Sequence, residues 1–417
     1  MNERPVHLIV SDDLERSRVS VFFRLILAIP HLIWLGLWGI AAAFAVIANW
    51  FATLFAGQSP ASLHNFLAAY VRYAIHVGAY LLLAAQPFPE FTGAPGYPVD
   101  VEIAPPQPQN RWKVAFRIVL AIPALMIAGA LTSGGARSYG GAGSTYGLAA
   151  VAALLTWFAA LARSRAPRGL RDAVAYGLSY SAQLDAYLFL LTDRYPNSDP
   201  QVAFAGLPVR ESDPIRLQVG EDSRRSRLTV FLRLILALPH ILWLILWGIV
   251  VFFAAIANWL ATLVRGQSPD GLHNFLAAYV RYQTHVYAYL FLIAEPFPGF
   301  LGRPGSYPVE ASIAPPQPQN PWKVAFRLIL GIPALMLDSA YGSLLFAVAV
   351  LGWFASLATG SMPLGMRNAG ALGLRYAAQA HGYLLLLCEA YPYSGPTVPA
   401  VAEPAPLVSP AAAPTGL

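Results

Sequence analysis

Two segments of this chain place arginine and histidine inside otherwise apolar sequence. The segment FLAAYVRYAIHVGAYLLL at residues 66–83 returns as FLAAYVRYQTHVYAYLFL at residues 275–292. Arg72, His76 and Tyr80 are four residues apart, so they share one face of a helix. Their counterparts in the second segment are Arg281, His285 and Tyr289. A guanidinium beside an imidazole can hold an anionic group or pass protons, so this face is a candidate ligand site.

Other polar residues recur in the same way. Asn49 and Asn258 each precede a tryptophan near the end of an apolar run, and they complete the candidate site. Arginine followed six residues later by proline occurs four times, and we expect these side chains to extend to lipid headgroups: Arg24, Arg117, Arg233 and Arg327. The alternative is structural, with Arg72 bound to Asn49, Tyr70 or a backbone carbonyl between two helices.

The residues that carry metal, haem or covalent chemistry are sparse. His64 and His76 are twelve residues apart, about 120° around a helix, so they do not converge as ligands by themselves. The single cysteine, Cys388, excludes an intramolecular disulfide. The sequence has no phosphate-binding Gly-Lys loop, no HExxH and no Gly-x-Ser-x-Gly elbow. We therefore predict a non-enzymatic protein with no catalytic residues, no metal and no cofactor.

The elements that hold these residues are apolar enough for a membrane. The chain is 57% hydrophobic and 12% charged, against roughly 25% charged in soluble domains. Residues 25–56 and 234–264 contain no Asp, Glu, Lys or Arg, and both runs exceed the roughly 18 residues that mark a membrane span. The chain has a net charge of +6, and its basic residues cluster beside these apolar runs. This placement favours lipid over nucleic acid as the partner.

The chain is built from repeats. FFRLILAIPHLIW at residues 22–34 returns as FLRLILALPHILW at 231–243, and each half is itself double, because FRIVLAIPAL at 116–125 echoes FRLILAIPHL at 23–32. We predict four units of one strand and two helices, in which proline kinks or interrupts the first helix. The predicted units and tail are residues 1–90, 91–200, 201–299, 300–393 and a disordered Pro/Ala-rich tail at 394–417.

The predicted fold is an all-α integral membrane protein of about eight transmembrane or in-plane helices. Two spans per unit bring all four strands to one face, where we expect a single small sheet from residues 6–10, 99–103, 215–219 and 309–313. Arginines cluster on that face, and cytoplasmic segments of membrane proteins are rich in basic residues. We therefore expect this face and both termini to be cytoplasmic. Gln58 and Gln267 are then expected on the opposite side of a bacterial plasma membrane, and the two halves are related as parallel repeats.

Three motifs resemble a known family. RLILAIPHLIWLGLWGI, GQSPASLHNFLAAYVRY and PFPEF are similar to the bacterial membrane proteins grouped as domain of unknown function 4389. The resemblance covers roughly residues 15–200 and 220–395. It implies a multi-pass membrane protein, and it names no catalytic residue. Residues 179 and 183 are Ser and Gln, and residues 375 and 379 are Arg and Gln, where the better-matching units have Arg and His.

The resulting functional expectation is a pseudo-symmetric scaffold, or a binder of lipid or another amphipathic molecule between the halves. The first alternative is a transporter of a small solute or lipid, because duplicated halves supply two bundles. The second is a membrane enzyme or haem carrier that uses the Arg/His face. Membrane lipids are the expected partner, whereas a protein partner or a homo-oligomer is left open.

Overall fold

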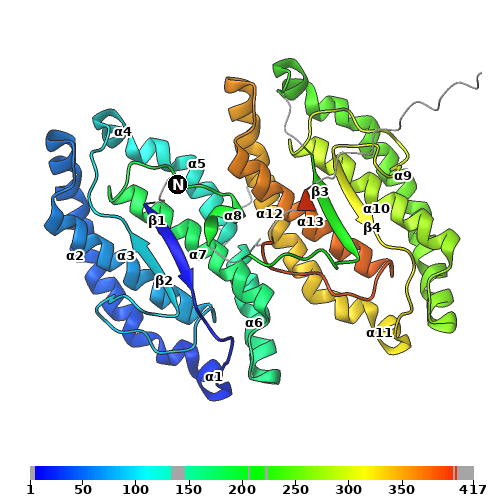
Figure 1. The fold of residues 1–417 in the computed structure, drawn as a ribbon, viewed down its shortest axis with the longest axis horizontal. Helices are drawn as coiled ribbons and strands as arrows, with labels where there is room; N and C mark the ends of the chain where they lie inside the picture. Colours follow the sequence, from blue (N-terminus) through cyan, green and yellow to red (C-terminus); the bar gives the residue numbers. More distant parts are fainter. Residues whose placement is uncertain (1–4, 133–145, 205–206, 221–223, 398–399, 402–417) are drawn as a thin grey trace, which may run out of the picture.

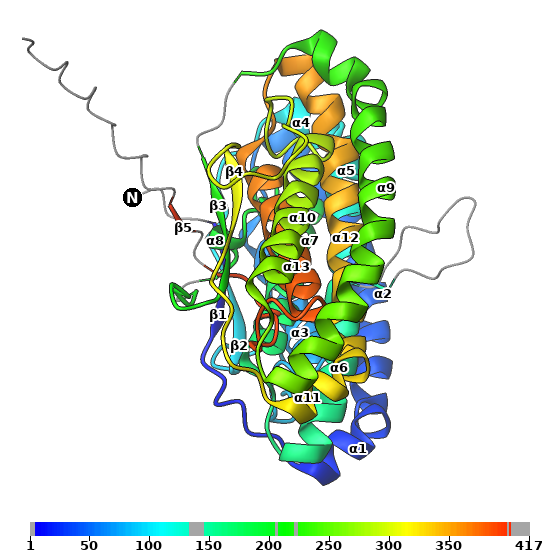
Figure 2. The ribbon, with the colours of Figure 1, turned by 90° about the vertical axis from the view of Figure 1, so that its right-hand side faces the viewer.

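The molecule is a slab of three layers, two of helices and one of strands (Figures 1 and 2). The computed structural model describes residues 5–132, 146–204, 207–220, 224–397 and 400–401. Four helices form the inner layer: α3 (Ala61–Leu81), α7 (Arg168–Leu188), α10 (Asp270–Leu290) and α13 (Leu364–Leu384). The strands cover one side of this layer, and the most apolar helices cover the other side.

The apolar helices form the outer layer. Its members are α1 (Arg18–Leu27), α2 (Ile29–Ala56), α5 (Arg117–Leu131), α6 (Leu148–Arg163), α9 (Arg227–Arg265) and α12 (Arg327–Thr359). Short helices precede α5 and α12, namely α4 (Arg111–Ala115) and α11 (Pro321–Ala325), and α8 (Pro200–Ala203) follows α7. Among the described residues, three stretches are long and apolar enough to span a membrane: Arg18–Ala56, Arg227–Arg265 and Arg327–Thr359.

The expected interruption at proline occurs in one unit only. The helix breaks at Ala28, two residues before Pro30. In contrast, α5, α9 and α12 continue through Pro123, Pro239 and Pro333. Proline removes one backbone donor, and a long helix that packs along its neighbour on both sides of the proline tolerates this loss.

The strands have the predicted bounds but form two sheets, so the single sheet was wrong. β1 (Val6–Val10) pairs antiparallel with β2 (Val99–Ile103), and β3 (Ile215–Val219) pairs antiparallel with β4 (Val309–Ile313). Each sheet lies on the inner helices of its own half. One edge of each sheet is occupied, because Phe204 bridges to Leu8 of β1 and β5 (Ala400–Val401) pairs with β3. β5 lies within the predicted disordered tail, and residues 402–417 of that tail lie outside the described part.

The outer helices of each half run antiparallel and meet at their ends. The start of α1 lies beside the end of α6, where the Arg16 amide donates to Ser164 O at 2.9 Å. The end of α2 lies beside α4, where the backbone amide of Gln109 donates to Gly57 O at 2.8 Å. The second half repeats both contacts through Arg225 with Gly360 and Gln319 with Gly266. The halves join where α12 packs against α5 and α6.

This arrangement corrects the predicted sidedness of the turns. The Gln58 side chain donates to Pro106 O at 3.0 Å, and Gln267 donates to Pro316 O at 3.0 Å. Pro106 follows β2 by only three residues, a reach of about 10 Å, whereas a hydrocarbon core is about 30 Å thick. Gln58 and β2 therefore lie on the same side of any membrane, as do Gln267 and β4.

Candidate functional site

The Arg/His face of the inner helices packs under the strands. In the first half, His76 Nε2 lies 2.8 Å from Asp100 Oδ1 of β2, and Arg72 Nε lies 3.6 Å from the same oxygen. Arg72 also donates to Val101 O at 3.2 Å and Gly93 O at 3.4 Å. The Tyr97 ring lies 4.7 Å from the imidazole of His76. The predicted ligand pair is thus engaged with the chain segment that follows its own helix.

The second half repeats this cluster with a glutamate. Arg281 Nε lies 2.8 Å from Glu310 Oε1, and His285 Nε2 lies 3.1 Å from Glu310 Oε2. Arg281 also donates to the carbonyls of Ala311 and Gly302, at 3.3 and 3.1 Å. We call these two groups, Arg72–His76–Asp100 and Arg281–His285–Glu310, the strand anchors. Their bonds attach β2 and β4 to the inner layer.

The diverged positions make equivalent attachments without a carboxylate partner. Ser179 donates to Ala203 O at 2.6 Å, and the Gln183 side chain accepts from the backbone amide of Asn197 at 3.0 Å. Arg375 donates to Gly395 O at 2.6 Å. Gln379 donates to Ile215 O at 3.0 Å and accepts from the backbone amide of Tyr393. The common property of these positions is a bond to the segment that follows the helix.

The ionisation of Asp100 follows from its bonds. Burial opposes the charged form, but hydrogen bonds from His76 and from the amides of Gly96 and Val101 outweigh it. The pKa of the Asp100 carboxyl is therefore held below its usual value. A carboxylate that remains ionised beside His76 and Arg72 forms a charge-assisted anchor.

The four arginines expected at lipid headgroups point inward instead. Arg24, Arg117, Arg233 and Arg327 are each no more than 2% exposed. Each guanidinium stacks over a tyrosine of the inner layer, at 4.3, 4.1, 4.4 and 4.0 Å from the rings of Tyr80, Tyr187, Tyr289 and Tyr383, respectively. Each also donates to the carbonyl five residues after that tyrosine, namely Ala85, Thr192, Ala294 and Cys388. The prediction of extended side chains is therefore wrong.

These arginine clamps end the inner helices. Three residues after each tyrosine stands a leucine with left-handed backbone: Leu83, Leu190, Leu292 and Leu386, with φ of 61–62°. Glycine is the usual residue for this conformation, since a leucine side chain is strained there. The clamp holds the carbonyls beyond the leucine, and the cation is favourable at the C-terminal end of a helix. Tyr80 and Tyr289 thus belong to the clamps and lie outside the strand anchors.

The two asparagines join neighbouring inner and outer helices. Asn49 donates to Phe189 O at the end of α7 at 2.9 Å and accepts from the Ser59 hydroxyl at 2.7 Å. Asn258 makes the same contacts with Leu385 O and Ser268. Neither asparagine contacts Arg72 or Arg281 among the bonds of the described residues. The eight predicted ligand residues are therefore divided among three structural clusters per half.

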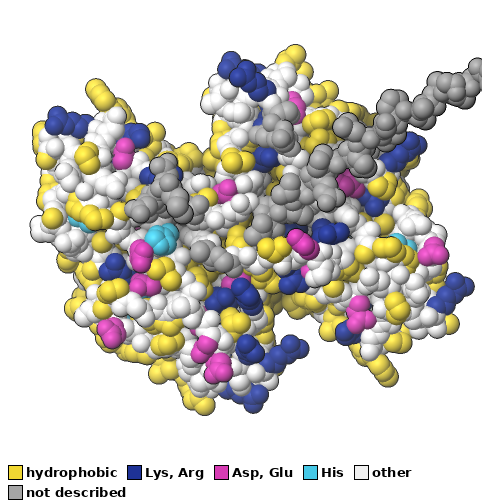
Figure 3. All heavy atoms as spheres, in the orientation of Figure 1, with side chains coloured by type: hydrophobic (Ala, Val, Ile, Leu, Met, Phe, Trp, Pro, Cys, Tyr) yellow, Lys and Arg dark blue, Asp and Glu magenta, His cyan; other side chains and the backbone are white. Residues whose placement is uncertain are grey.

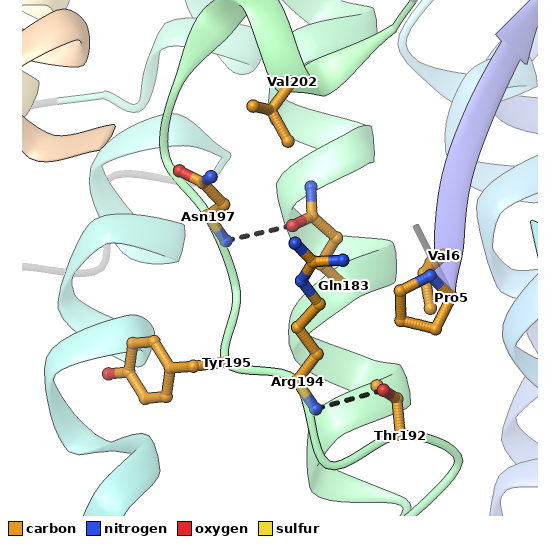
Figure 4. Close-up of a pocket in the computed structure, with 8 residues that line it drawn as sticks. All are labelled: Pro5, Val6, Gln183, Thr192, Arg194, Tyr195, Asn197 and Val202. Carbon is orange, nitrogen blue, oxygen red and sulfur yellow. Dashed lines mark hydrogen bonds between the residues drawn. The ribbon is translucent and has the colours of Figure 1, made fainter. Parts of the chain in front are cut away.

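A small cavity lies beside the neutral position Gln183 (Figure 4). Its volume is about 120 Å³, and it opens between β1 and the segment after α7. Its lining combines apolar and polar groups: Pro5, Val6, Gln183, Thr192, Arg194, Tyr195, Asn197 and Val202. Within the described residues, no three His, Cys, Asp or Glu side chains are placed to hold a metal ion. The cavity can take a few water molecules or a small polar group.

Asp100 and Glu310 are the functional partners that sequence reasoning missed. Both stand in predicted strands, next to valine or alanine, and both follow the histidine by about 25 residues. The signal was available, since an acidic residue recurs in each strand that follows an Arg/His helix.

The chain belongs to the family described as domain of unknown function 4389. The family model matches three tandem copies, at residues 18–92, 227–301 and 321–394, which together cover more than half of the chain. The predicted membership is thereby confirmed, as is its tandem arrangement. Each matched segment contains the outer-layer helix or helices of one unit, one inner helix and one arginine clamp. No curated protein and no solved structure matches the chain.

Proposed function

We propose that this protein is a non-enzymatic membrane scaffold, built from four strand-helix-helix units, whose outer layer contacts lipid and whose sheets form a rigid platform in water. One observation carries the proposal: polar side chains are buried in the interior, whereas large apolar side chains cover one surface. Arginine, histidine and asparagine are buried inside the molecule, while phenylalanine, leucine and isoleucine are exposed along α2 and α9. Water disfavours such a surface, whereas lipid accommodates it.

The buried polar groups support a structural role over a binding one. The strand anchors, the arginine clamps and the asparagine bonds all end on groups of the same chain. A ligand would have to displace one of these bonds, and leaving a buried partner unsatisfied costs about 1–3 kcal/mol. The platform is therefore built to remain in one conformation, as a scaffold requires.

Flotation with liposomes tests the lipid contact. The outer-face double variant Phe44→Asp/Phe253→Asp puts charge at two sites that are 70% and 65% exposed. Val209→Asp is the matched control, because Val209 is an exposed apolar residue in the segment that leads into β3, outside the outer helices. The wild-type protein and the Val209 variant should float with liposomes after detergent removal, and the double variant should float far less. Equal flotation of all three proteins, or a wild type that stays monodisperse in water without lipid, would refute the proposal.

A further inference from the structure

The outer layer presents an apolar face along the full length of its helices. Exposed large side chains extend from Phe22 to Phe55 on α1 and α2 and from Leu228 to Val264 on α9. Within the most apolar 18 residues of each of these two stretches, only 11% and 17% of the residues, respectively, are buried. Soluble monomers rarely expose continuous apolar patches of more than a few hundred Å². This face needs an apolar partner as long as the helices themselves.

The length of the helices fits a bilayer poorly if they stand upright. Arg227–Arg265 is one helix of 39 residues, which at 1.5 Å per residue is about 58 Å long. The hydrocarbon core is about 30 Å thick. An upright α9 would carry exposed apolar residues such as Leu228 and Val264 far into water at its two ends.

The sheet face gives the second argument. The strands lie along the middle of the inner helices, since Asp100 binds His76 and Glu310 binds His285 within α3 and α10. This face also carries the exposed pair of His7 and Glu102. Figure 3 shows acidic and basic side chains spread over it. In an upright molecule these charges would lie at the depth of the lipid tails, at about 3 kcal/mol each.

Charge and tryptophan mark the ends of the slab. Trp112 and Trp322, on α4 and α11, are 76% and 75% exposed, and each precedes a lysine. Tryptophan prefers the boundary between lipid tails and headgroups, and lysine beside it favours anionic headgroups. Further exposed basic residues stand at the ends of the outer helices: Arg18, Arg111, Arg163, Arg227 and Arg265. Both ends of the slab therefore suit the same anionic lipid surface.

We infer that the protein lies flat in a single leaflet, with the outer helices in the membrane plane and the sheet face parallel to the surface, and that no helix crosses the bilayer. This inference rests on the proposed lipid contact and specifies its geometry. The strand-helix-helix segments then all turn the same face to the membrane, which agrees with strands on one side and apolar helices on the other (Figure 2). The occupant of the outer face is one leaflet of an anionic bilayer.

Depth measurement along a helix tests the orientation. Single cysteines at Leu25, Phe44 and Phe55, and at Leu234, Phe253 and Val264, would carry a fluorophore in a Cys388→Ser background. All six sites are exposed, so labelling should leave the fold intact. Lipids with quenchers at several depths then report each label in phosphatidylglycerol-containing liposomes. A flat molecule places all six labels at a similar shallow depth.

The outcomes separate the inference from the proposed function. A profile with deep central labels and shallow ends would overturn the flat orientation but leave the lipid contact standing. Absence of quenching at every site would overturn both. A label at Glu102 serves as the matched site on the sheet face and should not be quenched.

Sidedness and charge provide independent readouts. Gln58 and Arg163 are exposed residues at opposite ends of the outer helices of the first half. A membrane-impermeant maleimide should label single cysteines at these two sites from the same side of sealed vesicles, and labelling from opposite sides would overturn the inference. Arg111→Gln and Arg265→Gln, at exposed sites at the ends of the slab, should each weaken binding to anionic vesicles about fivefold, since a basic residue near the surface contributes about 1 kcal/mol. Unchanged binding in both variants would refute the anionic leaflet as occupant.

Discussion

Arg72 and Arg281 hold strands in place, and this assignment predicts what their loss does. Each donates two hydrogen bonds to backbone carbonyls and faces a carboxylate. The double variant Arg72→Ala/Arg281→Ala should lower the free energy of unfolding by about 1–3 kcal/mol per site, because buried acceptors lose their donors. Thermal unfolding in detergent measures this loss, and Arg265→Ala, at an exposed site, is the control.

Lipid analysis of the same double variant distinguishes an anchor from a binding site. The co-purified anionic lipid should match the wild-type amount, since these side chains are occupied by the protein itself. A fall in bound lipid at unchanged thermal stability would instead assign the two arginines to a ligand.

Asp100 makes the stability of the first half depend on pH. Its pKa is lowered in the folded protein, so its contribution is complete above the ordinary value of about 3.9 and is lost as the pH falls through the folded value. Asp100→Asn should therefore cost about 1.5–3 kcal/mol at pH 7. The gap between wild type and variant should narrow below about pH 4. Chemical unfolding at a series of pH values measures it, and a gap that is independent of pH would exclude the carboxylate.

At the scale of the elements, the arginine clamp explains how an inner helix ends without glycine. Arg24→Ala removes bonds to the carbonyls of Tyr80 and Ala85, at 2.7 and 2.9 Å, and the stacking on the Tyr80 ring. We expect a loss of several kcal/mol, larger than for Arg72→Ala, because more buried acceptors are left. Hydrogen exchange should accelerate first at residues 78–85. Protection there equal to wild type would show that Leu83 holds its left-handed conformation without the clamp.

At the scale of the whole molecule, polar bonds across the two halves predict cooperative unfolding. Asn368 of α13 donates to Asp199 at 2.8 Å, and Tyr393 donates to Asp172 at 3.2 Å. A double-mutant cycle of Asp199→Ala and Asn368→Ala should give a coupling of about 0.5–3 kcal/mol, because the two side chains are in contact. The cycle also removes the effect of Asp199 as the cap of α8. Strict additivity of the two substitutions would show that the halves are energetically independent at this contact.

The repeat pattern by itself determined much of the architecture. The bounds of β1 to β4, the apolar helices and the family followed from periodicity and repetition, because these depend only on residues that are close in the sequence. Arg72 with His76, and Arg281 with His285, were also correctly paired, since four residues separate neighbours on a helix face.

What covers each face was decided only by the tertiary structure. The Arg/His face was expected to meet a ligand, but it meets Asp100 and Glu310, which lie 24 and 25 positions after His76 and His285. The arginines before the prolines were expected at headgroups, but they meet helix ends 61 to 75 residues away. Periodicity determines which side chains share a face of a helix. It does not determine which other element of the chain packs against that face. Each half also formed its own sheet, and one edge of each sheet is occupied from within the chain, by Phe204 on β1 and by residues 400–401 on β3.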